Sequence, residues 1–336
     1  MKAILTTKYG SPDVLQVSEV ETPVPKDHEI LIKVHASSAT KADTMMRKGI
    51  PFYGRFFLGL TKPKNPITGT GFAGEIVKVG PKVTRYTNGD QVFGETGVNF
   101  GANAEFVCMP EDGLVIPKPS SLSYEEAAPI CDGVLSSMNF LSAIADIQRD
   151  QKVLINGASG SLGTAAVQLA RHFGAEVTGV CSTSNLEMVS SLGADHVIDY
   201  TKTDFTQSGE THDIIFDTIG KSSFSRCKKV LKENGVYLSP VLSFPLLLQM
   251  VWSSWMSRKK AKFSATGLRP VPELRILLDK IIEIIEAGEL KIVLDKKYRL
   301  EETPEAHRYI DKGHKKEMWL LFPESFNCNP RRSVYQ

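Results

Sequence analysis

With 336 residues, the chain is longer than a single hydrophobic core usually supports, so we expect two domains. Hydrophobic residues make up 42% of the sequence and charged residues 23%, which is ordinary for a soluble globular protein. Because 40 Lys and Arg are balanced by 38 Asp and Glu, the net charge gives no indication of a nucleic-acid or anionic-membrane partner.

Five cysteines are spread along the chain with no CxxC or HxxxH spacing, which argues against a disulfide framework and a structural zinc lobe. We expect reduced thiols and a cytoplasmic compartment. The N-terminal sequence MKAILTTKYG lacks the apolar segment of a secretory signal, so none is expected.

Short segments of alternating apolar and polar residues, separated by Gly, Pro and Asp, fill the first third of the chain and predict antiparallel strands. They cover residues 1–7, 15–20, 30–36, 72–79, 91–93, 104–109 and 114–116. Together they predict a small, irregular barrel. The aromatic segment 50–60 between them is either core filling under a long connection or a lid over a substrate.

From Tyr124 onward, apolar helical segments alternate with short apolar strands. After a first strand that begins at Val153, the predicted strands are residues 176–181, 196–200, 213–217 and 235–240, and the helices include residues 185–192 and 223–233. This alternation predicts βαβ units and a parallel sheet covered by helices on both faces.

The most apolar stretch runs from Leu242 to Met256 and is shorter than the roughly 20 residues that span a bilayer. We expect a buried helix that lines a ligand cleft or a subunit contact. Three basic residues, 258–260, follow it and leave a membrane-surface anchor as the weaker alternative.

The C-terminal part predicts a helix over residues 272–287, a strand over 292–298 and a helix that begins at Thr303. Thr303 is expected to be the N-cap of that helix, and Pro304 its first residue. The last residues, 323–336, form a polar tail.

A glycine-rich turn follows the strand that begins at Val153. Against the dinucleotide fingerprint GxGxxG, the chain has Ala158, Gly160 and Gly163. Gly160 would let the backbone approach a pyrophosphate, and Gly163 would let the helix pack closely on the strand. The helix that begins near Ser161 would direct free amides at the phosphates. Because the turn lies between an apolar strand and an amphipathic helix, it predicts a dinucleotide site.

The end of the next strand indicates which dinucleotide binds. An NAD site usually has Asp or Glu there, and that carboxylate repels a 2′-phosphate. Here residues 181–185 are Cys, Ser, Thr, Ser and Asn, with no acid before Glu187. Neutral hydroxyl groups admit the phosphate and predict NADPH. The alternative is a solvated turn without selectivity, because this loop has no arginine to bind the phosphate.

Several segments in the same order carry a family resemblance: YGSPDVL, GFAGEIVKVG, GDQVFG, the glycine turn within NGASGSLGTAAVQLARHFGAEVTGVCSTSN, LGADHVIDY, DIIFDTIG and EAHRYIDKGHKK. They resemble the zinc-free medium-chain dehydrogenase/reductases, namely the quinone oxidoreductases and enone reductases related to zeta-crystallin. The resemblance covers the chain up to about residue 322.

This resemblance implies an α/β protein with a GroES-like, β-rich catalytic domain of residues 1–122 and 270–336. Residues 123–269 would form a Rossmann NADP-binding domain with a doubly wound parallel sheet. In such proteins a hydride passes from NADPH to a quinone or to the β-carbon of an α,β-unsaturated carbonyl. Relatives often pair through the edge of the Rossmann sheet, here residues 261–265, so a homodimer is expected.

No metal is expected. Zinc alcohol dehydrogenases of the same superfold have Cys where this chain has Thr40, and a His-Glu pair where it has Thr70 and Gly71. Catalytic zinc needs three protein ligands, and Cys131 alone cannot hold it. Cys131 is better explained as a buried small residue near the nicotinamide. Zinc-free relatives usually have an acid at the Gly71 position.

The candidate contacts to a substrate carbonyl are Thr40, Lys41 and Tyr53, each with the alternative of a surface or capping role. Related enzymes often have Asn at the Thr40 position, but a Thr hydroxyl also donates a hydrogen bond. Where relatives have a Thr that reaches the carboxamide, this chain has Leu135, and Ser136 could replace it.

The resemblance also implies the cofactor contacts. They are Ser159, Gly160, Ser161, Leu162 and Gly163 at the pyrophosphate, Ser182 and Thr183 at the 2′-phosphate, Tyr200 at the adenosine, and Asp217 to Gly220 at the nicotinamide ribose. The alternative function is a non-catalytic NADPH-binding protein with a partner- or membrane-facing role.

Overall fold

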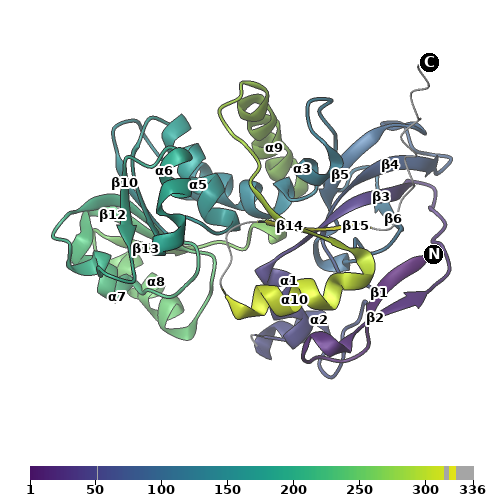
Figure 1. The fold of residues 1–336 in the computed structure, drawn as a ribbon, viewed down its shortest axis with the longest axis horizontal. Helices are drawn as coiled ribbons and strands as arrows, with labels where there is room; N and C mark the ends of the chain where they lie inside the picture. The colour runs from purple at the N-terminus through teal and green to yellow at the C-terminus, as the bar shows by residue number, and fades with distance from the viewer. Residues whose placement is uncertain (51, 314–317, 323–336) are drawn as a thin grey trace, which may run out of the picture.

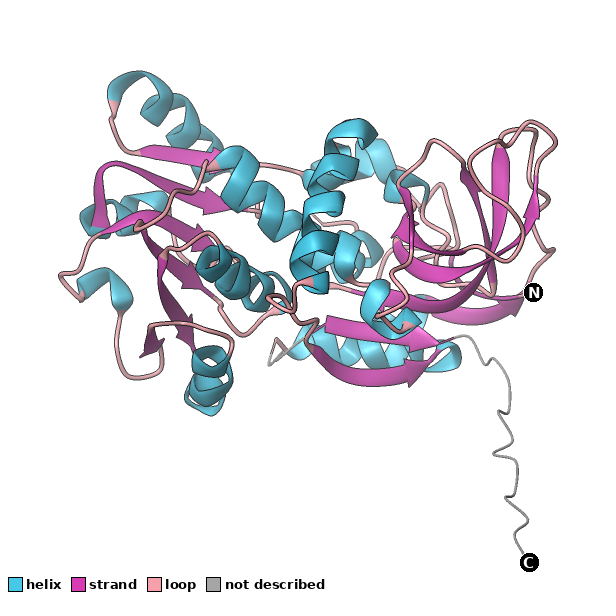
Figure 2. Ribbon diagram, turned by 90° about the horizontal axis from the view of Figure 1, so that it is seen from above, coloured by secondary structure: helices cyan, strands magenta, loops and turns pink. Residues whose placement is uncertain are grey.

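The computed structural model describes residues 1–50, 52–313 and 318–322, so the predicted tail, 323–336, lies outside the described residues. Two large sheets lie toward opposite ends of the molecule, with helices on and between them (Figure 1). Seen from above, helices lie on both sides of the parallel sheet (Figure 2). The predicted α/β architecture is thus confirmed, whereas the domain boundaries stay a prediction.

The six-stranded sheet is parallel throughout and has the order β10-β9-β8-β11-β12-β13. Its strands are β8 (Lys152–Asn156), β9 (Glu176–Cys181), β10 (His196–Asp199), β11 (His212–Asp217), β12 (Leu231–Ser239) and β13 (Lys260–Phe263). Counted from β8, this is the order 3-2-1-4-5-6 of a dinucleotide-binding sheet. The order in which strands are added to the sheet reverses between β8 and β11, and such sheets bind ligands at this point.

Both faces of this sheet are buried because successive side chains of each strand point to opposite sides. Ile155 and Phe216 belong to a core cluster on one face. Leu154 and Ile215 belong to a second cluster on the other face. The near-continuous apolar strands therefore reflect two covered faces, as the sequence predicted.

The other part of the protein contains a seven-stranded sheet, antiparallel except for the parallel pair β14 and β15, and a separate antiparallel pair, β1 (Lys2–Thr6) with β2 (Leu15–Glu19). The large sheet has the order β14-β15-β3-β4-β5-β7, and β6 also pairs with β3. Its strands are β3 (Glu29–Ala39), β4 (Gly71–Val79), β5 (Gln91–Glu95), β6 (Phe106–Pro110), β7 (Val115–Pro117), β14 (Leu294–Arg299) and β15 (Met318–Phe322). Strands from both ends of the chain thus form one sheet.

Ten α-helices connect these strands within the described residues. They are α1 (Lys41–Lys48), α2 (Arg55–Leu58), α3 (Tyr124–Ala127), α4 (Leu135–Met138), α5 (Ser161–His172), α6 (Leu186–Ser191), α7 (Phe224–Cys227), α8 (Phe244–Met256), α9 (Val271–Glu286) and α10 (Thr303–Lys312).

A helical stretch, Tyr124–Ile144, lies between the two sheets. It includes π-helical turns at Ile130–Val134 and Asn139–Ile144. Among the described residues, this stretch alone is long and apolar enough to cross a membrane. However, 72% of its apolar window is buried inside the protein, as in a core helix. Its side chains join the interior of both sheets into one cluster.

Two sequence predictions about helices need correction. The predicted helix 223–233 ends at Cys227, and β12 already begins at Leu231, because Val230 and Leu231 enter the core under the sheet. Thr303 is the first residue of α10 and Glu302 its N-cap. The Thr303 hydroxyl donates to the carbonyl of Leu300 instead of capping the helix.

The sequence predicted a buried helix over residues 242–256, but within this chain most of the helix is not buried. Helix α8 buries only Leu246 and Ser253, and most of its apolar side chains are exposed. Segment 50–60 is likewise exposed at Phe52 and Phe56, so core filling does not explain these two residues.

Candidate functional site

The glycine turn after β8 brings backbone atoms closer together than side chains would allow. Gly157 has a φ of +82°, which favours glycine. A Cβ on Gly163 would lie 2.1 Å from the Gly157 carbonyl oxygen. Helix α5 can therefore pack against the turn only with glycine at position 163. A Cβ on Gly160 would meet only the Gly157 oxygen, at 3.4 Å, so this side of the turn is open.

The N-terminus of α5 lacks a side-chain cap. Its N-cap is Gly160, which has no side chain to accept hydrogen bonds from the first amides. The Ser161 hydroxyl is buried and has no hydrogen-bond partner among the described residues. These donors need an acceptor, and the pyrophosphate of a dinucleotide would supply one. The residues present thus fit the predicted cofactor.

The carboxyl ends of the neighbouring strands bring the other predicted cofactor residues to the same edge of the sheet. Asn185 Nδ2 donates to Ser159 Oγ and to Ser182 Oγ, both at 3.1 Å, and so links the glycine turn to the loop after β9. Tyr200, just after β10, is 59% exposed, and its amide donates to the carbonyl of Cys181. The backbone carbonyl of Leu162, in α5, accepts a hydrogen bond from Ser137 Oγ of α4 at 2.8 Å.

The sequence argument missed one residue beside the predicted 2′-phosphate position, Asp199. Its carboxylate accepts the hydroxyl proton of Thr183. Hydrogen bonds from Thr183 and Thr201 lower the pKa of Asp199 to about 2. Lys202 Nζ lies 3.7 Å from the same carboxylate. Because Asp199 pairs with Cys181 in the parallel register, the convergence of strand ends could have indicated it.

At the end of β11, the Asp217 side chain has no exposed surface. Its carboxylate accepts hydrogen bonds from Asn156 Nδ2, the Tyr237 hydroxyl and the amides of Gly220 and Ser222. The carboxylate therefore fixes the shape of loop 217–222. Asp217 can therefore offer only its backbone to the predicted ribose contact. Gly220, the other residue predicted there, is exposed and has a φ of +65°.

The candidate substrate contacts lie at and beyond the N-terminus of α1. Thr40 is the N-cap, and both its amide and its hydroxyl donate to Asp43 Oδ2 at 2.7 Å. Its single hydroxyl proton is thus already engaged. Lys41 is 55% exposed at its side chain and lies 3.8 Å from Asp311 on α10. Tyr53 belongs to the short helical turn Phe52–Gly54, and its side chain lies outside the described part of the structure.

A carboxyl group from the central helical stretch occupies the space beside Gly71. A Cβ on Gly71 would lie 2.6 Å from Asp132 Oδ2 and 2.4 Å from Ser38 Oγ. Asp132 accepts hydrogen bonds from the Ser38 hydroxyl and, at 3.5 Å, from Thr70 Oγ1. Zinc-free relatives were expected to have an acid at position 71. Here glycine in β4 leaves room for an acid from the facing helix.

Three carboxyl groups share this region. Burial and then the charges of Glu95 and Asp43 raise the pKa of Asp132 well above its usual value. Burial and then the Asp43 charge raise the pKa of Glu95 to about 7. Asp43 is the cap acceptor of α1. Because burial and nearby like charges oppose ionisation, they favour the protonated form of Asp132 over the carboxylate.

The π-helical turn Ile130–Val134 joins this carboxyl group to the cofactor turn. Asp132 faces the seven-stranded sheet, and the next residue, Gly133, abuts α5. A Cβ on Gly133 would lie 2.4 Å from Ser161 Oγ. Two adjacent residues of this turn, Asp132 and Gly133, thus contact β4 and the start of α5, respectively.

The donor set does not fit a catalytic zinc ion. Thr40, Thr70 and Gly71 supply neither thiolate nor imidazole, which leaves the thiol of Cys131. Burial raises the pKa of that thiol well above its usual value. In the described part of the chain, no three His, Cys, Asp or Glu side chains are grouped to hold a metal ion.

Two family models match the chain. Residues 26–120 match the alcohol dehydrogenase GroES-like domain, and residues 192–316 match a model described as zinc-binding dehydrogenase. The donor set above does not provide the zinc site that the second description implies.

Similar proteins include a 2-methylene-furan-3-one reductase of Solanum lycopersicum, 33% identical over 84% of this chain and 74% of that protein. An NADPH-dependent alkenal/one oxidoreductase of Arabidopsis thaliana is 32% identical over 70% of this chain and 61% of that protein. The quinone oxidoreductase structure from Coxiella burnetii has a TM-score of 0.86 at 26% identity, and the match covers 96% of this chain and 99% of that one.

Substitution Gly163→Val is expected to abolish NADPH binding, because even its Cβ would overlap the Gly157 carbonyl and displace α5. We expect a rise in Kd of at least about a hundredfold in a fluorescence titration. Gly54→Ala is the matched control, since a Cβ there has no neighbour within 4 Å. Unchanged affinity of Gly163→Val would refute the cofactor site.

Substitution Glu95→Gln should change how stability depends on pH. The folded-state pKa of Glu95 is raised from 4.5 to about 7, so its contribution to stability is fully present below pH 4.5 and is lost as the pH rises through 7. Gln does not ionise. In urea unfolding, the variant should therefore gain about 1–3 kcal/mol relative to the wild type between pH 5 and pH 8. The exposed Glu187→Gln is the control, and equal pH dependence of Glu95→Gln and wild type would contradict the buried position.

Proposed function

The chain belongs to the zinc-free medium-chain dehydrogenase/reductases, the family of quinone oxidoreductases and enone reductases, and we propose that it reduces a quinone or an α,β-unsaturated carbonyl with NADPH. The observation that carries this proposal is the uncapped start of α5, which lies against the helical turn that bears the carboxyl group of Asp132. The non-catalytic alternative is not favoured, because the relatives named above are oxidoreductases.

Binding of the cofactor is assigned to the carboxyl edge of the parallel sheet. The amides at the start of α5 and the Ser161 hydroxyl would hold the pyrophosphate. Ser182 and Thr183 would border the 2′-phosphate, where the Asp199 charge is offset by Lys202. NADPH supplies the hydride when bound.

The two substrate classes differ in their need for a proton. Quinone oxygens can take a proton from water. Hydride addition to the β-carbon of an enone leaves an enolate, which needs a proton at its α-carbon or oxygen. Burial and neighbouring charges raise the pKa of Asp132, and its carboxyl oxygens accept hydrogen bonds from the hydroxyls of Ser38 and Thr70. We therefore assign Asp132 as the candidate donor, and keep Thr40, Lys41 and Tyr53 as candidates for contacts with the substrate.

Two further expectations belong to this proposal. Pairing of two copies would use β13, the edge strand of the parallel sheet, as the resemblance implied. A cytoplasmic location rests on the free thiols of the four described cysteines, Cys108, Cys131, Cys181 and Cys227.

The function is tested by incubating the purified protein with NADPH and a panel of ortho-quinones and alkenones, and following absorbance at 340 nm. We expect oxidation of NADPH with at least one acceptor. Binding of NADPH with no oxidation by any acceptor would contradict the enzymatic function. Tighter binding of NADH than of NADPH would contradict the choice of cofactor.

Substitution Asp132→Asn should separate the two substrate classes. General acid catalysis typically contributes about 10²–10⁴-fold, so we expect kcat for an alkenone to fall by at least about a hundredfold. Turnover of a quinone should change little, because its product takes protons from water. Equal loss with both acceptors, at unchanged NADPH affinity, would show that Asp132 does not act as the donor.

A further inference from the structure

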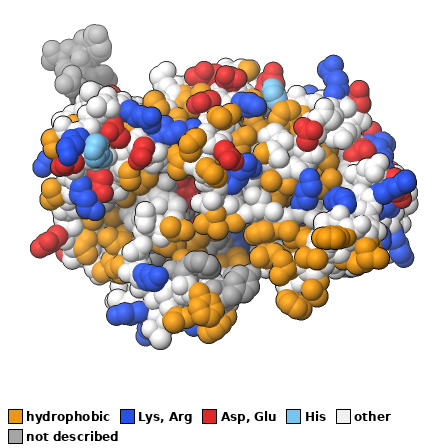
Figure 3. Space-filling model, turned by 180° about the vertical axis from the view of Figure 1, so that it is seen from behind, with side chains coloured by type: hydrophobic (Ala, Val, Ile, Leu, Met, Phe, Trp, Pro, Cys, Tyr) orange, Lys and Arg blue, Asp and Glu red, His pale blue; other side chains and the backbone are white. Residues whose placement is uncertain are grey.

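Helix α8 turns its apolar side outward. Leu246 and Ser253 point into the protein and are buried. Phe244, Leu248, Val251 and Trp255 follow at helical spacing and are 72%, 54%, 59% and 88% exposed. Leu247, Trp252 and Met256 extend this surface, which we call the α8 face. Hydrophobic side chains gather at the lower edge of the back view, on the side of the molecule that carries α8 (Figure 3).

The sequence segments on either side of α8 are basic. Between residues 218 and 263 there are nine Lys or Arg and one acid, so this stretch carries a formal charge of +8 in a chain of +2. Arg226 and Lys232 pair with acidic residues. The other seven form no ion pair with a described acid: Lys221, Lys228, Lys229, Arg258, Lys259, Lys260 and Lys262. The near-zero net charge of the whole chain thus conceals a local excess of cations.

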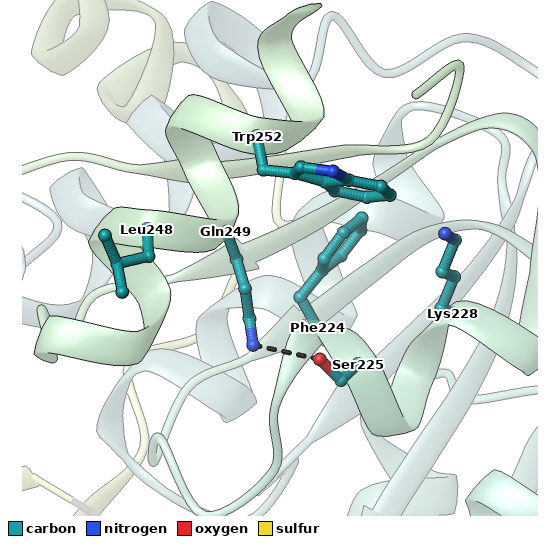
Figure 4. A pocket seen from close by; sticks show the side chains of 6 residues that line it. All are labelled: Phe224, Ser225, Lys228, Leu248, Gln249 and Trp252. Carbon is teal, nitrogen blue, oxygen red and sulfur yellow. Dashed lines mark hydrogen bonds between the residues drawn. The ribbon is translucent and has the colours of Figure 1, made fainter. Parts of the chain in front are cut away.

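A hollow beside α8 combines both properties. It is lined by Leu248, Gln249 and Trp252 from the helix and by Phe224, Ser225 and Lys228 from the segment beneath (Figure 4). The Lys228 ammonium lies 4.4 Å from the centre of the Trp252 ring. Gln249 Nε2 donates to Ser225 Oγ at 2.9 Å and closes one wall. A cation thus lies at the rim of an apolar hollow.

We propose that the α8 face docks this protein on the surface of a bilayer that contains anionic phospholipid. Tryptophan, phenylalanine and leucine would enter the interface between headgroups and acyl chains, where such side chains bind. Lys228, Arg258 and Lys259 would lie against the headgroup phosphates. The 13 residues of α8 are too few to span a bilayer, so the helix lies in the plane of the surface.

A second copy of the chain, which we expect at the edge of β13, fits the α8 face itself less well. A two-fold contact uses the same patch on both subunits, so the cations around α8 would face their own counterparts. Like charges placed opposite each other oppose such a contact. An anionic surface instead complements the charge of the patch and its apolar centre together.

The full-length protein is tested by flotation with vesicles of phosphatidylcholine containing about 30% phosphatidylglycerol, and with vesicles of phosphatidylcholine alone. We expect binding to the anionic vesicles at least about tenfold tighter than to the neutral ones. About 0.5 M NaCl should release the protein, because it shortens the screening length. Equal binding to both vesicles, or binding to neither, would overturn the proposal.

Two variants test the apolar contact and the electrostatic attraction separately. Trp255→Ser removes an exposed apolar side chain, and Arg258→Gln removes an exposed cation. Each should weaken binding to anionic vesicles by about fivefold or more. Ile276→Ser, 58% exposed on α9, is the matched control and should bind like the wild type.

NADPH affinity and the mass from light scattering show that each variant is folded and report its oligomeric state. Wild-type vesicle binding by Trp255→Ser would refute the role of the α8 face. A wild-type dimer that ignores vesicles and dissociates on Trp255→Ser would show that a second copy covers this face.

Discussion

Two close contacts around the π-helical turn Ile130–Val134 determine how the two halves of the site meet. Gly133 leaves no room for a side chain against Ser161 of α5, and Gly71 leaves none against Asp132. A side chain at Gly133 would push the turn away from α5, and one at Gly71 would push it away from β4. The start of the cofactor helix and the carboxyl group are therefore held at a fixed separation by adjacent residues of one turn.

This arrangement places an acid away from the strand position at which the resemblance implies one. Gly71 in β4 has no side chain, and Asp132 fills the space from the opposite side. Burial and the charges of Glu95 and Asp43 raise the pKa of Asp132, and burial and the charge of Asp43 raise that of Glu95. With a donor set that does not suit zinc, the proposed chemistry rests on a binding edge for NADPH and on the carboxyl group of Asp132.

The glycine turn was predictable because each of its constraints is local: the strand, the close contact at Gly163 and the helix start lie within about 20 residues. Asp199 was within reach of the sequence argument, since it ends the strand next to Cys181. Asp132 was not, because its position beside Gly71 depends on how two distant segments pack.

The exposure of helix α8 could not be predicted from its sequence. An apolar segment of this length is usually buried, but burial depends on which elements remain to cover it. Here one side of α8 completes the core against β13, and no described element covers the other side. The charge of the surrounding surface was also hidden, since acidic residues elsewhere cancel it in the total.

The central claim, hydride transfer from NADPH at this site, is tested most directly by isotope transfer. The protein is incubated with NADPH deuterated at C4 of the nicotinamide, separately for each face, and with an alkenone that it reduces. We predict that deuterium from one face alone is found at the β-carbon of the product by NMR, with a chelator present. Product without deuterium at that carbon, from either labelled face, would contradict the account.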